Sequence, residues 1–397
     1  MKSNYKRLGN YIHEVNIRNK ALVEAPLMGV SIKKVLMPSI ANIIGTDMST
    51  YKLIQKNQFA YGPVTSRNGD KISIALLEEH NNAMVSQAYT VFEVIDEKEL
   101  HPEYLMMWFR RPEFDRYARF MSHGSAREIF SWTEMCDTLL PIPSPEKQFE
   151  IVKEYNIIQN RIALNNQLIT KLEETAQAIY KQWFVDFEFP DENGLPYKSN
   201  GGEMVLCEEL EKEIPVGWEI KTFGEISEIK AGGDKPNTFS SIKTLKCSIP
   251  IYSNGVTNEG LYGFTNKFNY PKNSITISAR GTIGYSVLRN ESFDAIVRLL
   301  VVIPKISNSA IYLWQVIRTI DFDNSGSVQN QLTIPQVTII RLMMPPLDIL
   351  DKYDSILKLI YKENEILSIE NQKVMELKEL LLAKMTKVET EIVTVEN

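Results

Sequence analysis

Cysteine is scarce in this chain, and no apolar run is long enough to cross a membrane. The 397 residues contain an odd, scattered set of cysteines that favours neither a disulfide framework nor a zinc site: Cys136, Cys207 and Cys247. No uninterrupted apolar stretch approaches the ~20 residues that a membrane span needs. The N-terminal segment lacks the apolar core of a signal peptide. We therefore expect a protein of the reducing cytoplasm.

Signatures of catalysis are also missing. There is no Gly-x-x-x-x-Gly-Lys phosphate loop, and no Asn-Pro-Pro-aromatic tetrapeptide of the kind with which amino-methyltransferases hold a flipped adenine. The histidines do not fall at metal-ligand spacing: His13, His80, His101 and His123. The sequence predicts no catalytic residue and no metal site, and it favours a binding protein over an enzyme.

The net charge of −6 is distributed unevenly. Residues 1–144 carry +1 and residues 218–347 carry +4, whereas residues 145–217 carry −7 and residues 348–397 carry −4. A whole-chain sum therefore hides two regions that are neutral to mildly basic. The alternation is the first indication of a repeat.

The chain matches itself at a period of about 200 residues, which indicates a duplicated unit. The segment from Gly124-Ser125 to Pro143 matches the segment from Gly326-Ser327 to Pro345 without a gap, at an offset of 202. Two earlier pairs occur in the same order: Arg7-Leu8-Gly9 with Thr222-Phe223-Gly224, and Ser66-Arg67-Asn68-Gly69 with Ala279-Arg280-Gly281-Thr282.

Each repeat ends in a segment whose apolar residues recur at steps of three and four, as in a helix with a heptad seam. The first helix follows the Ser144-Pro145 cap, and its seam is Ile151, Tyr155, Ile158, Ile162, Asn165, Ile169, Leu172, Ala176, Ile179 and Trp183. The second follows Pro345-Pro346, and its stripe is Ile349, Tyr353, Ile356, Ile360, Leu367, Val374, Leu377, Leu381 and Met385.

Polar residues interrupt both stripes. Glu363 and Glu370 fall on the second stripe, so its pattern is imperfect. Asn165 lies on the first, where a buried polar residue commonly sets the register of paired helices. Each helix would be about 57 Å long. We expect residues 145–182 and 347–387 to pair antiparallel; the alternative is that each helix packs only on its own domain.

Between the helices the pattern predicts mixed domains in which strands dominate. Strand-like segments rich in β-branched residues are Val85–Val94, Ser274–Ser278 and Ala295–Ile303. Residues 183–217 have the composition of turns and a linker. The expected fold class is α+β, with two mixed α/β domains, related by a pseudo-two-fold, separated by two long antiparallel coiled-coil helices.

A series of specific motifs runs from the end of the first long helix into the second domain. It begins with Trp183-Phe184-Val185-Asp186-Phe187-Glu188-Phe189-Pro190, followed by Gly194-Leu195-Pro196-Tyr197, Gly201-Gly202-Glu203-Met204-Val205 and Ile214-Pro215-Val216-Gly217-Trp218-Glu219. It continues with Ala231-Gly232-Gly233-Asp234-Lys235-Pro236 and Ile277-Ser278-Ala279-Arg280-Gly281-Thr282-Ile283-Gly284. In this order the motifs resemble the specificity (S) subunits of type I restriction–modification systems. The resemblance covers nearly the whole chain and is weakest in the first domain.

The resemblance implies a division of labour. Residues 1–144 and 218–346 would be target recognition domains, each reading one half of an asymmetric bipartite site in double-stranded DNA. The helices at 145–182 and 347–387, with a linker at 183–217 and a tail at 388–397, would set the separation of the domains and bind two modification (M) subunits. The chain itself would hold no cofactor. The modification subunits would carry S-adenosylmethionine for methylation of adenine N6, and restriction (R) subunits would use ATP and Mg²⁺.

Candidate DNA contacts are cations and amides close to glycine turns, because arginine and lysine read guanine and amides read adenine. They are Arg67, Lys71, Arg127, Lys235, Arg280, Gln329 and Asn330. Arg67 and Arg280 occupy matched positions in the two repeats. For each residue the alternative is a solvated surface position or a turn that only supports the fold.

Two other functions remain open from the sequence. A single-chain DNA methyltransferase or nuclease with fused recognition domains would need catalytic motifs, and it would bind S-adenosylmethionine. A coiled-coil scaffold without a DNA role would show no sequence preference in a gel shift.

Overall fold

The structure is a computed structural model that describes residues 5–40, 45–66, 68–69, 71–124, 127–322 and 331–385. The chain divides into two compact units, the first formed by Met1–Asn166 and Ser368–Asn397 and the second by Gln167–Leu367. Each unit therefore contains one part of each long helix. Across the described ranges, no helix is both long enough and apolar enough to span a membrane.

The first unit contains two four-stranded sheets, with strand orders β2-β9-β6-β7 and β4-β3-β8-β5, and an antiparallel pair formed by β1 and β10. The strands are β1 (Tyr5–Arg7), β2 (Ile12–Val15), β3 (Leu27–Val30), β4 (Leu36–Pro38), β5 (Lys52–Gln55), β6 (Phe59–Tyr61), β7 (Ile74–Leu76), β8 (Asn82–Val85), β9 (Thr90–Val94) and β10 (Leu139–Pro141). The short helices are η1 (Leu8–Asn10), η2 (Met48–Thr50), α1 (Pro102–Phe109), α2 (Pro112–Phe120) and α3 (Trp132–Asp137).

The second unit contains sheets of order β14-β20-β17-β18 and β16-β15-β19, the pair of β13 with β21, and a hairpin of β11 and β12. The strands are β11 (Met204–Cys207), β12 (Lys212–Pro215), β13 (Glu219–Thr222), β14 (Ser227–Ala231), β15 (Ile249–Tyr252), β16 (Leu261–Thr265), β17 (Ser274–Ile277), β18 (Ser286–Arg289), β19 (Asp294–Ala295), β20 (Leu300–Pro304) and β21 (Arg341–Met344). The short helices are α5 (Phe223–Ile226), η4 (Thr257–Gly260), α6 (Ala310–Thr319) and α7 (Ile334–Thr338).

The two units share one strand topology. The sheet β2-β9-β6-β7 repeats as β14-β20-β17-β18. In each unit the neighbouring sheet contains a strand that pairs antiparallel with the next strand and parallel with a later one: β3 with β4 and β8, and β15 with β16 and β19. Domains that fold alike at an offset of about 200 residues are what the internal duplication predicts, and the predicted fold class is confirmed.

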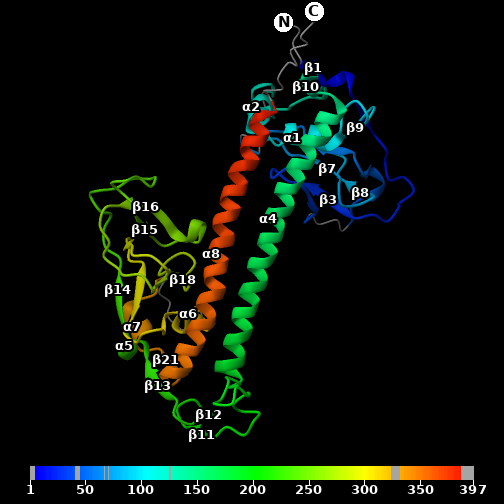
Figure 1. Cartoon of the computed structure of the whole chain (residues 1–397). Coiled ribbons are helices and arrows are strands. Elements are labelled where there is room, and N and C mark those ends of the chain that lie inside the picture. Colours follow the sequence, from blue (N-terminus) through cyan, green and yellow to red (C-terminus); the bar gives the residue numbers. More distant parts are fainter. Residues whose placement is uncertain are drawn as a thin grey trace, which may run out of the picture. The chain divides into compact units, whose positions relative to one another are not determined.

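Both long helices begin where the sequence predicts. Helix α4 (Pro145–Tyr180) continues into one π-helical turn, η3 (Lys181–Val185), and α8 spans Leu347–Lys384. Within each unit α4 and α8 run alongside each other in opposite directions (Figure 1). In the first unit, for example, Gln159 of α4 accepts a hydrogen bond from Lys378 of α8, and Asn165, further along α4, contacts Asn371, which comes earlier in α8.

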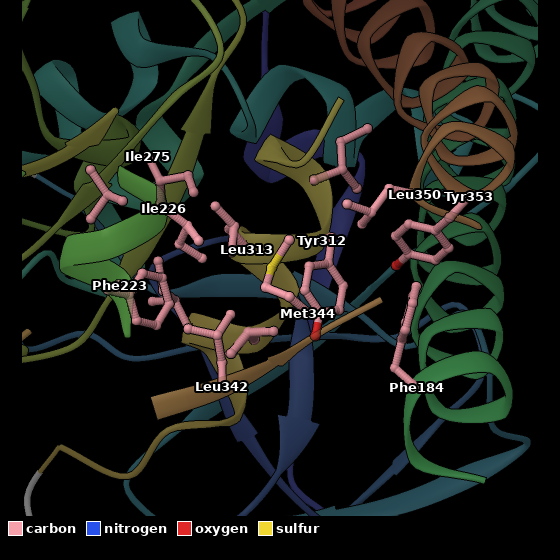
Figure 2. Close-up of a cluster of buried hydrophobic side chains, with 14 of the residues drawn as sticks. Phe184, Phe223, Ile226, Ile275, Tyr312, Leu313, Leu342, Met344, Leu350 and Tyr353 are labelled. Atoms are coloured by element: carbon pink, nitrogen blue, oxygen red, sulfur yellow. The ribbon is translucent and has the colours of Figure 1, made fainter. Parts of the chain in front are cut away.

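The core of the second unit joins the sheet to both helices. Figure 2 shows Tyr312 and Met344 between Phe223 on one side and the helix residues Phe184 and Tyr353 on the other. The ring centroid of Phe184 lies 4.6 Å from that of Tyr312 and 4.7 Å from that of Tyr353. The aromatic residues that follow α4 are therefore part of this core, although the composition of residues 183–217 predicts a linker.

In the first unit the core is built around stacked aromatic rings. Phe59 of β6 and Phe92 of β9 stack with ring centroids 4.8 Å apart, and both make T-shaped, edge-to-face contacts with Phe109 of α1. The same cluster contains buried residues of both long helices, including Tyr155 of α4 and Leu382 of α8. Apolar burial thus fixes the helix pair onto the sheet in each unit.

Two predicted strands are each broken by a turn. Residues 86–89 separate β8 from β9, so Val85–Val94 is not one strand; the backbone N–H of Tyr89 donates to the carbonyl oxygen of Ser86. Likewise, Ile296–Leu299 separates β19 from β20 within the β-branched run Ala295–Ile303. Residue type alone gives no turn signal in the second run. The third predicted strand, Ser274–Ser278, is present as β17.

Candidate nucleic-acid interface

Two segments of the second unit that are about 50 residues apart in sequence are hydrogen-bonded to each other. They are the loop between β17 and β18, residues 278–285, and residues 331–333, which precede α7. The backbone N–H of Leu332 donates to the carbonyl oxygen of Ala279 at 2.9 Å. The Arg280 guanidinium donates from Nε and Nη2 to Oε1 of Gln331, at 3.1 and 2.8 Å. We call these two segments the candidate loops of the second unit.

The first unit contains the same arrangement. Its candidate loops are the connection between β6 and β7, residues 62–73, and residues 122–131, which lead into α3. The backbone N–H of Phe130 donates to the carbonyl oxygen of Pro63 at 2.8 Å, and Phe130 and Leu332 are 202 residues apart. Thr65 strengthens the contact, because its backbone N–H donates to the carbonyl oxygen of Glu128 at 3.0 Å. The duplication therefore includes the pairing of the candidate loops.

Three of the predicted DNA contacts lie on these loops. Arg280 and Lys71 are exposed on the connections between paired strands, and Arg127 is exposed in the segment before α3. Arg67, Gln329 and Asn330 lie outside the described residues. Gln331, next to the last two, is half-buried and holds Arg280.

Lys235 belongs to a third loop of the second unit, residues 232–235, at the end of β14. Its Nζ lies 3.5 Å from the ring centroid of Phe239 and 5.3 Å from that of Tyr262. Such cation–π contacts orient an ammonium group without neutralising it. The backbone N–H of Gly232 donates to the carbonyl oxygen of Leu299, which attaches this loop to the turn between β19 and β20.

Asn254 is a half-buried residue that connects three segments and that no sequence motif indicates. Its Oδ1 accepts a hydrogen bond of 2.7 Å from the backbone N–H of Ala279. Its Nδ2 donates at 2.7 Å to the carbonyl oxygen of Val297. One side chain therefore joins the loop after β15, the loop that carries Arg280, and the turn between β19 and β20.

Arg289 is a second residue that the sequence analysis missed. It is buried, and its guanidinium lies 3.5 Å from the ring centroid of Tyr252. Nη2 donates at 2.7 Å to the carbonyl oxygen of Glu259, and Nε donates at 3.0 Å to Oγ1 of Thr276. Burial lowers the pKa of Arg289, and these contacts compensate the buried charge. Arg289 thus connects the loop after β15, through Glu259, to strand β17, through Thr276.

The chemistry available at these loops is that of binding. In the part of the chain that the structure describes, no group of three or more histidine, cysteine, aspartate or glutamate side chains could hold a metal ion. Exposed cations and amides on loops that are hydrogen-bonded to one another can contact base edges and phosphates.

The seam of α4 lies against α8 or the core along its whole length. All of its predicted positions are buried or half-buried, including Ile151, Ile158, Ile162, Asn165, Ile169 and Leu172. On α8 the same holds for Ile360, Leu367, Val374 and Leu381.

The structure corrects four positions of the predicted α8 stripe, each by one residue: Ile356, Glu363, Glu370 and Leu377. Ile356 and Leu377 are exposed, and their neighbours Leu357 and Lys378 occupy the seam. One residue further along a helix is rotated by about 100°, so a shift of one position moves a side chain off the contact face. The actual seam is Tyr353, Leu357, Ile360, Asn364, Leu367, Asn371, Val374, Lys378, Leu381 and Met385, which is the α4 seam displaced by 202.

In the first unit a polar pair interrupts this seam. Asn165 Nδ2 donates to Asn371 Oδ1 at 3.0 Å, and Asn371 Nδ2 donates to Asn166 Oδ1 at 2.9 Å. Both Asn165 and Asn371 are buried. Beside them Arg161 forms a two-pronged ion pair with Glu370, at 2.7 and 2.9 Å, which lowers the pKa of Glu370. A buried amide pair of this kind selects one register of the two helices.

Comparisons with known proteins agree with this architecture. Residues 215–377 match the family model described as "Type I restriction modification DNA specificity domain". The chain is 27% identical, over 72% of its length and 67% of the relative's, to the type I restriction enzyme MjaIX specificity subunit of Methanocaldococcus jannaschii. It is 22% identical to the HindI specificity subunit of Haemophilus influenzae, over 89% of this chain and 90% of that subunit.

A solved structure shares the fold. The crystal structure of the type I restriction–modification S subunit from M. genitalium matches with a TM-score of 0.65, covering 97% of this chain and 96% of that one at 14% identity. The chain is similar to type I specificity subunits over most of its length, and residues 215–377 match their DNA specificity domain. The matched domain includes both candidate loops of the second unit, Lys235, and most of α8, whereas the candidate loops of the first unit lie outside it.

Proposed function

We propose that this chain is a type I specificity subunit, which binds an asymmetric bipartite site in double-stranded DNA and positions methylation and restriction subunits on it. Residues 1–144 and 218–346 act as two target recognition domains, each reading one half-site. The observation that carries the proposal is the repeated pair of candidate loops, which present exposed cations in both units at equivalent places in the topology.

The two half-sites are expected to differ in sequence. The loops share a backbone arrangement but not their side chains: Arg127 and Lys71 are exposed in the first unit, whereas Arg280 with Gln331 and Lys235 occupy the second. Since bases are distinguished by side-chain donors and acceptors, unlike loops read unlike bases. Half-site centres about 34 Å apart would place both domains on one face of the duplex.

The helices suit protein partners better than DNA. The segments that contain them carry net charges of −7 and −4, which phosphates repel. An outward-facing apolar pair, seven residues apart, occurs on each helix at duplicated positions. On α4 it is Ile157 and Leu164, 60% and 56% exposed, and on α8 it is Leu359 and Ile366, 71% and 48% exposed.

Two equivalent apolar pairs fit two copies of one partner, each docking on one helix. The partner we propose is the modification subunit, which would carry S-adenosylmethionine and methylate adenine N6. Restriction subunits would add ATP- and Mg²⁺-dependent cleavage. This chain would contribute no cofactor and no catalytic group to either reaction.

Exchange of one recognition domain tests the proposal. Residues 1–144 are replaced by the first domain of another family member, and N6-methyladenine is mapped across the genome of a host that makes the modification subunit. One half of the methylated motif should change and the other should stay. A change in both halves would contradict the modular assignment, and no dependence of methylation on this chain would favour a scaffold. S-adenosylmethionine binding by the purified chain alone would favour a single-chain enzyme.

A further inference from the structure

A four-residue turn, Ile296–Leu299, joins β19 to β20 in the second unit. The backbone N–H of Leu299 donates to the carbonyl oxygen of Ile296 at 3.1 Å and closes the turn. Both central residues have left-handed backbone conformations, with φ of 55° at Val297 and 57° at Arg298. Two successive positive φ angles identify the type I′ pattern, in which Asn-Gly is strongly preferred because it adopts these angles with little strain.

Valine and arginine are unusual residues for these two positions. A β-branched side chain at positive φ is a genuine outlier, because its Cβ substituents crowd the backbone. Such conformations persist only where the surrounding structure holds them, and they cluster where a protein contacts its ligand. The turn therefore has valine and arginine at two positions where the backbone conformation favours asparagine and glycine.

The turn is held by two hydrogen bonds that its backbone donates to the loop at the end of β14. The backbone N–H of Val297 donates to the carbonyl oxygen of Gly233 at 2.9 Å, and that of Arg298 donates to the carbonyl oxygen of Gly232 at 3.1 Å. The turn consequently lies beside the loop that carries Lys235.

Asn254 attaches the turn to the candidate loops. Its Nδ2 donates to the carbonyl oxygen of Val297, and its Oδ1 accepts from the backbone N–H of Ala279, the residue before Arg280. Lys235, Arg280 and Arg298 thus belong to three connected segments. The turn with Arg298 is hydrogen-bonded directly to the loop of Lys235, and Asn254 connects this turn to the loop of Arg280.

The two turn side chains are available to a ligand. Val297 is 50% exposed, and Arg298 is exposed. Among the described residues, the Arg298 guanidinium has no recorded hydrogen bond or ion pair, in contrast to Arg280, which binds Gln331, and Arg289, which is buried. A free cation on a rigid, strained turn has no evident use in the fold.

We propose that the turn Val297–Arg298 is a base-reading element of the second recognition domain. Arg298 is its specificity-determining residue and donates to the major-groove edge of a guanine, and Val297 makes the apolar contact with the neighbouring base, as with a thymine methyl group. The inference rests on the proposed function, since it presumes that this domain reads DNA.

Three variants of the full chain, each tested with its modification subunit, examine the proposal. The methylated motif is mapped first with the parent chain. Arg298→Ala should then relax the motif at one position of one half-site, with a loss of discrimination of about 5- to 150-fold, and should leave the other half-site unchanged. Arg298→Lys should recover only part of the discrimination, because lysine lacks the planar two-pronged donor set.

The third variant separates reading from folding. Val297→Asn with Arg298→Gly installs the preferred turn residues, so the melting temperature should rise by about 2–4 °C while the motif relaxes as in Arg298→Ala. Glu211→Gly is the matched control. Glu211 has φ of 51° in the β11–β12 hairpin, outside the recognition loops, so this variant should gain stability without any change in the motif.

Each contrary outcome has a distinct meaning. If Arg298→Ala leaves the motif intact while Arg280→Ala alters it, the turn does not read DNA although the domain does. If Arg298→Ala weakens binding equally on all sequences and reduces its salt dependence, Arg298 contacts a phosphate and the inference is overturned. A fall in melting temperature in the Asn-Gly variant would assign the turn a structural role. Methylation that is independent of the whole chain would instead overturn the proposed function.

Discussion

Arg280 donates two hydrogen bonds to a single oxygen atom of Gln331, at 3.1 and 2.8 Å. A guanidinium group has five N–H donors, so three remain for a ligand after this contact. Gln331 therefore orients Arg280 without using up its binding capacity, which is the arrangement that a specific contact to a base requires.

Replacing Arg280 with alanine should relax base recognition in one half-site. We expect a loss of discrimination of about 5- to 150-fold at one base pair, because a two-pronged contact to guanine is removed. Binding of the complex with the modification subunit to oligonucleotides that carry single base-pair changes measures this effect. Gln331→Ala should have a smaller effect in the same direction, since it frees the orientation of Arg280 but retains the charge.

Arg341→Ala provides the comparison for Arg280. Arg341 is also exposed and also paired, at 2.9 Å with Glu209, but it lies on β21, outside the candidate loops. Exposed ion pairs contribute little to stability. The Arg341 variant should keep the parent motif; equal effects of both substitutions would show that net charge, and not position, governs recognition.

Asn165→Leu should destabilise the first unit by about 1–3 kcal/mol, because Asn371 Oδ1 would lose its buried donor. Equilibrium unfolding in urea measures the change as a lower midpoint at constant slope. Combining Asn165→Leu with Asn371→Leu removes both buried amides, and this double variant should recover most of the loss. A double variant whose loss equals the sum of the two single losses would show that the amides do not interact.

The double substitution Leu359→Glu and Ile366→Glu should reduce the number of bound modification subunits from two to one. Both side chains are exposed, so the fold should be unaffected, within about 0.5 kcal/mol. Native mass spectrometry of the co-purified complex counts the subunits. Met375→Glu is the control, since Met375 is similarly exposed on α8 but has Glu173 at the duplicated position. Retention of two subunits by the Leu359/Ile366 variant would place docking elsewhere.

Asp354→Asn should change how the stability of the second unit depends on pH. Burial raises the pKa of Asp354 above its ordinary 3.8, although the Lys358 ammonium opposes the shift. A raised pKa in the folded state means that the carboxyl favours folding below pH 3.8 and loses this contribution as pH rises through the folded pKa. The asparagine variant should therefore gain stability relative to the parent as pH increases from 3 to 7, in unfolding curves recorded at each pH. A constant difference would contradict this.

The duplication makes the long helices predictable, and it also specifies which positions of α8 lie on the seam. Local periodicity placed Leu377 on the α8 seam because it is apolar and Lys378 is not, and it could not separate Ile356 from its equally apolar neighbour Leu357. Displacing the α4 seam by 202 would have selected Leu357, Asn364, Asn371 and Lys378, which are the residues that the structure buries or half-buries. Polar seam positions are visible only through a second copy of the pattern.

The candidate site was predictable only in part. Glycine-flanked cations located the loops of Arg280 and Lys235, because tight turns have sequence signatures. The turn at Val297 and Arg298 has none, since valine and arginine in a β-branched run predict a continuous strand. Asn254 and Arg289 hold the loops through contacts 25 and 13 residues away, with Ala279 and Thr276 respectively, which no local pattern reveals.

The buried amides also make the two halves of the chain unequal. The positions that duplicate Asn165 and Asn371 are Leu367 and Ile169, which are apolar. If two copies of the first half were to associate with each other as the halves do within this chain, each Asn165 would meet Ile169, and an amide would be left without a donor or acceptor. Two copies of the second half would set Asn371 against Leu367 with the same penalty. Asn165 meets Asn371 only when a first half pairs with a second half. If the gene were split in two, the fragments would therefore prefer heterodimers over homodimers.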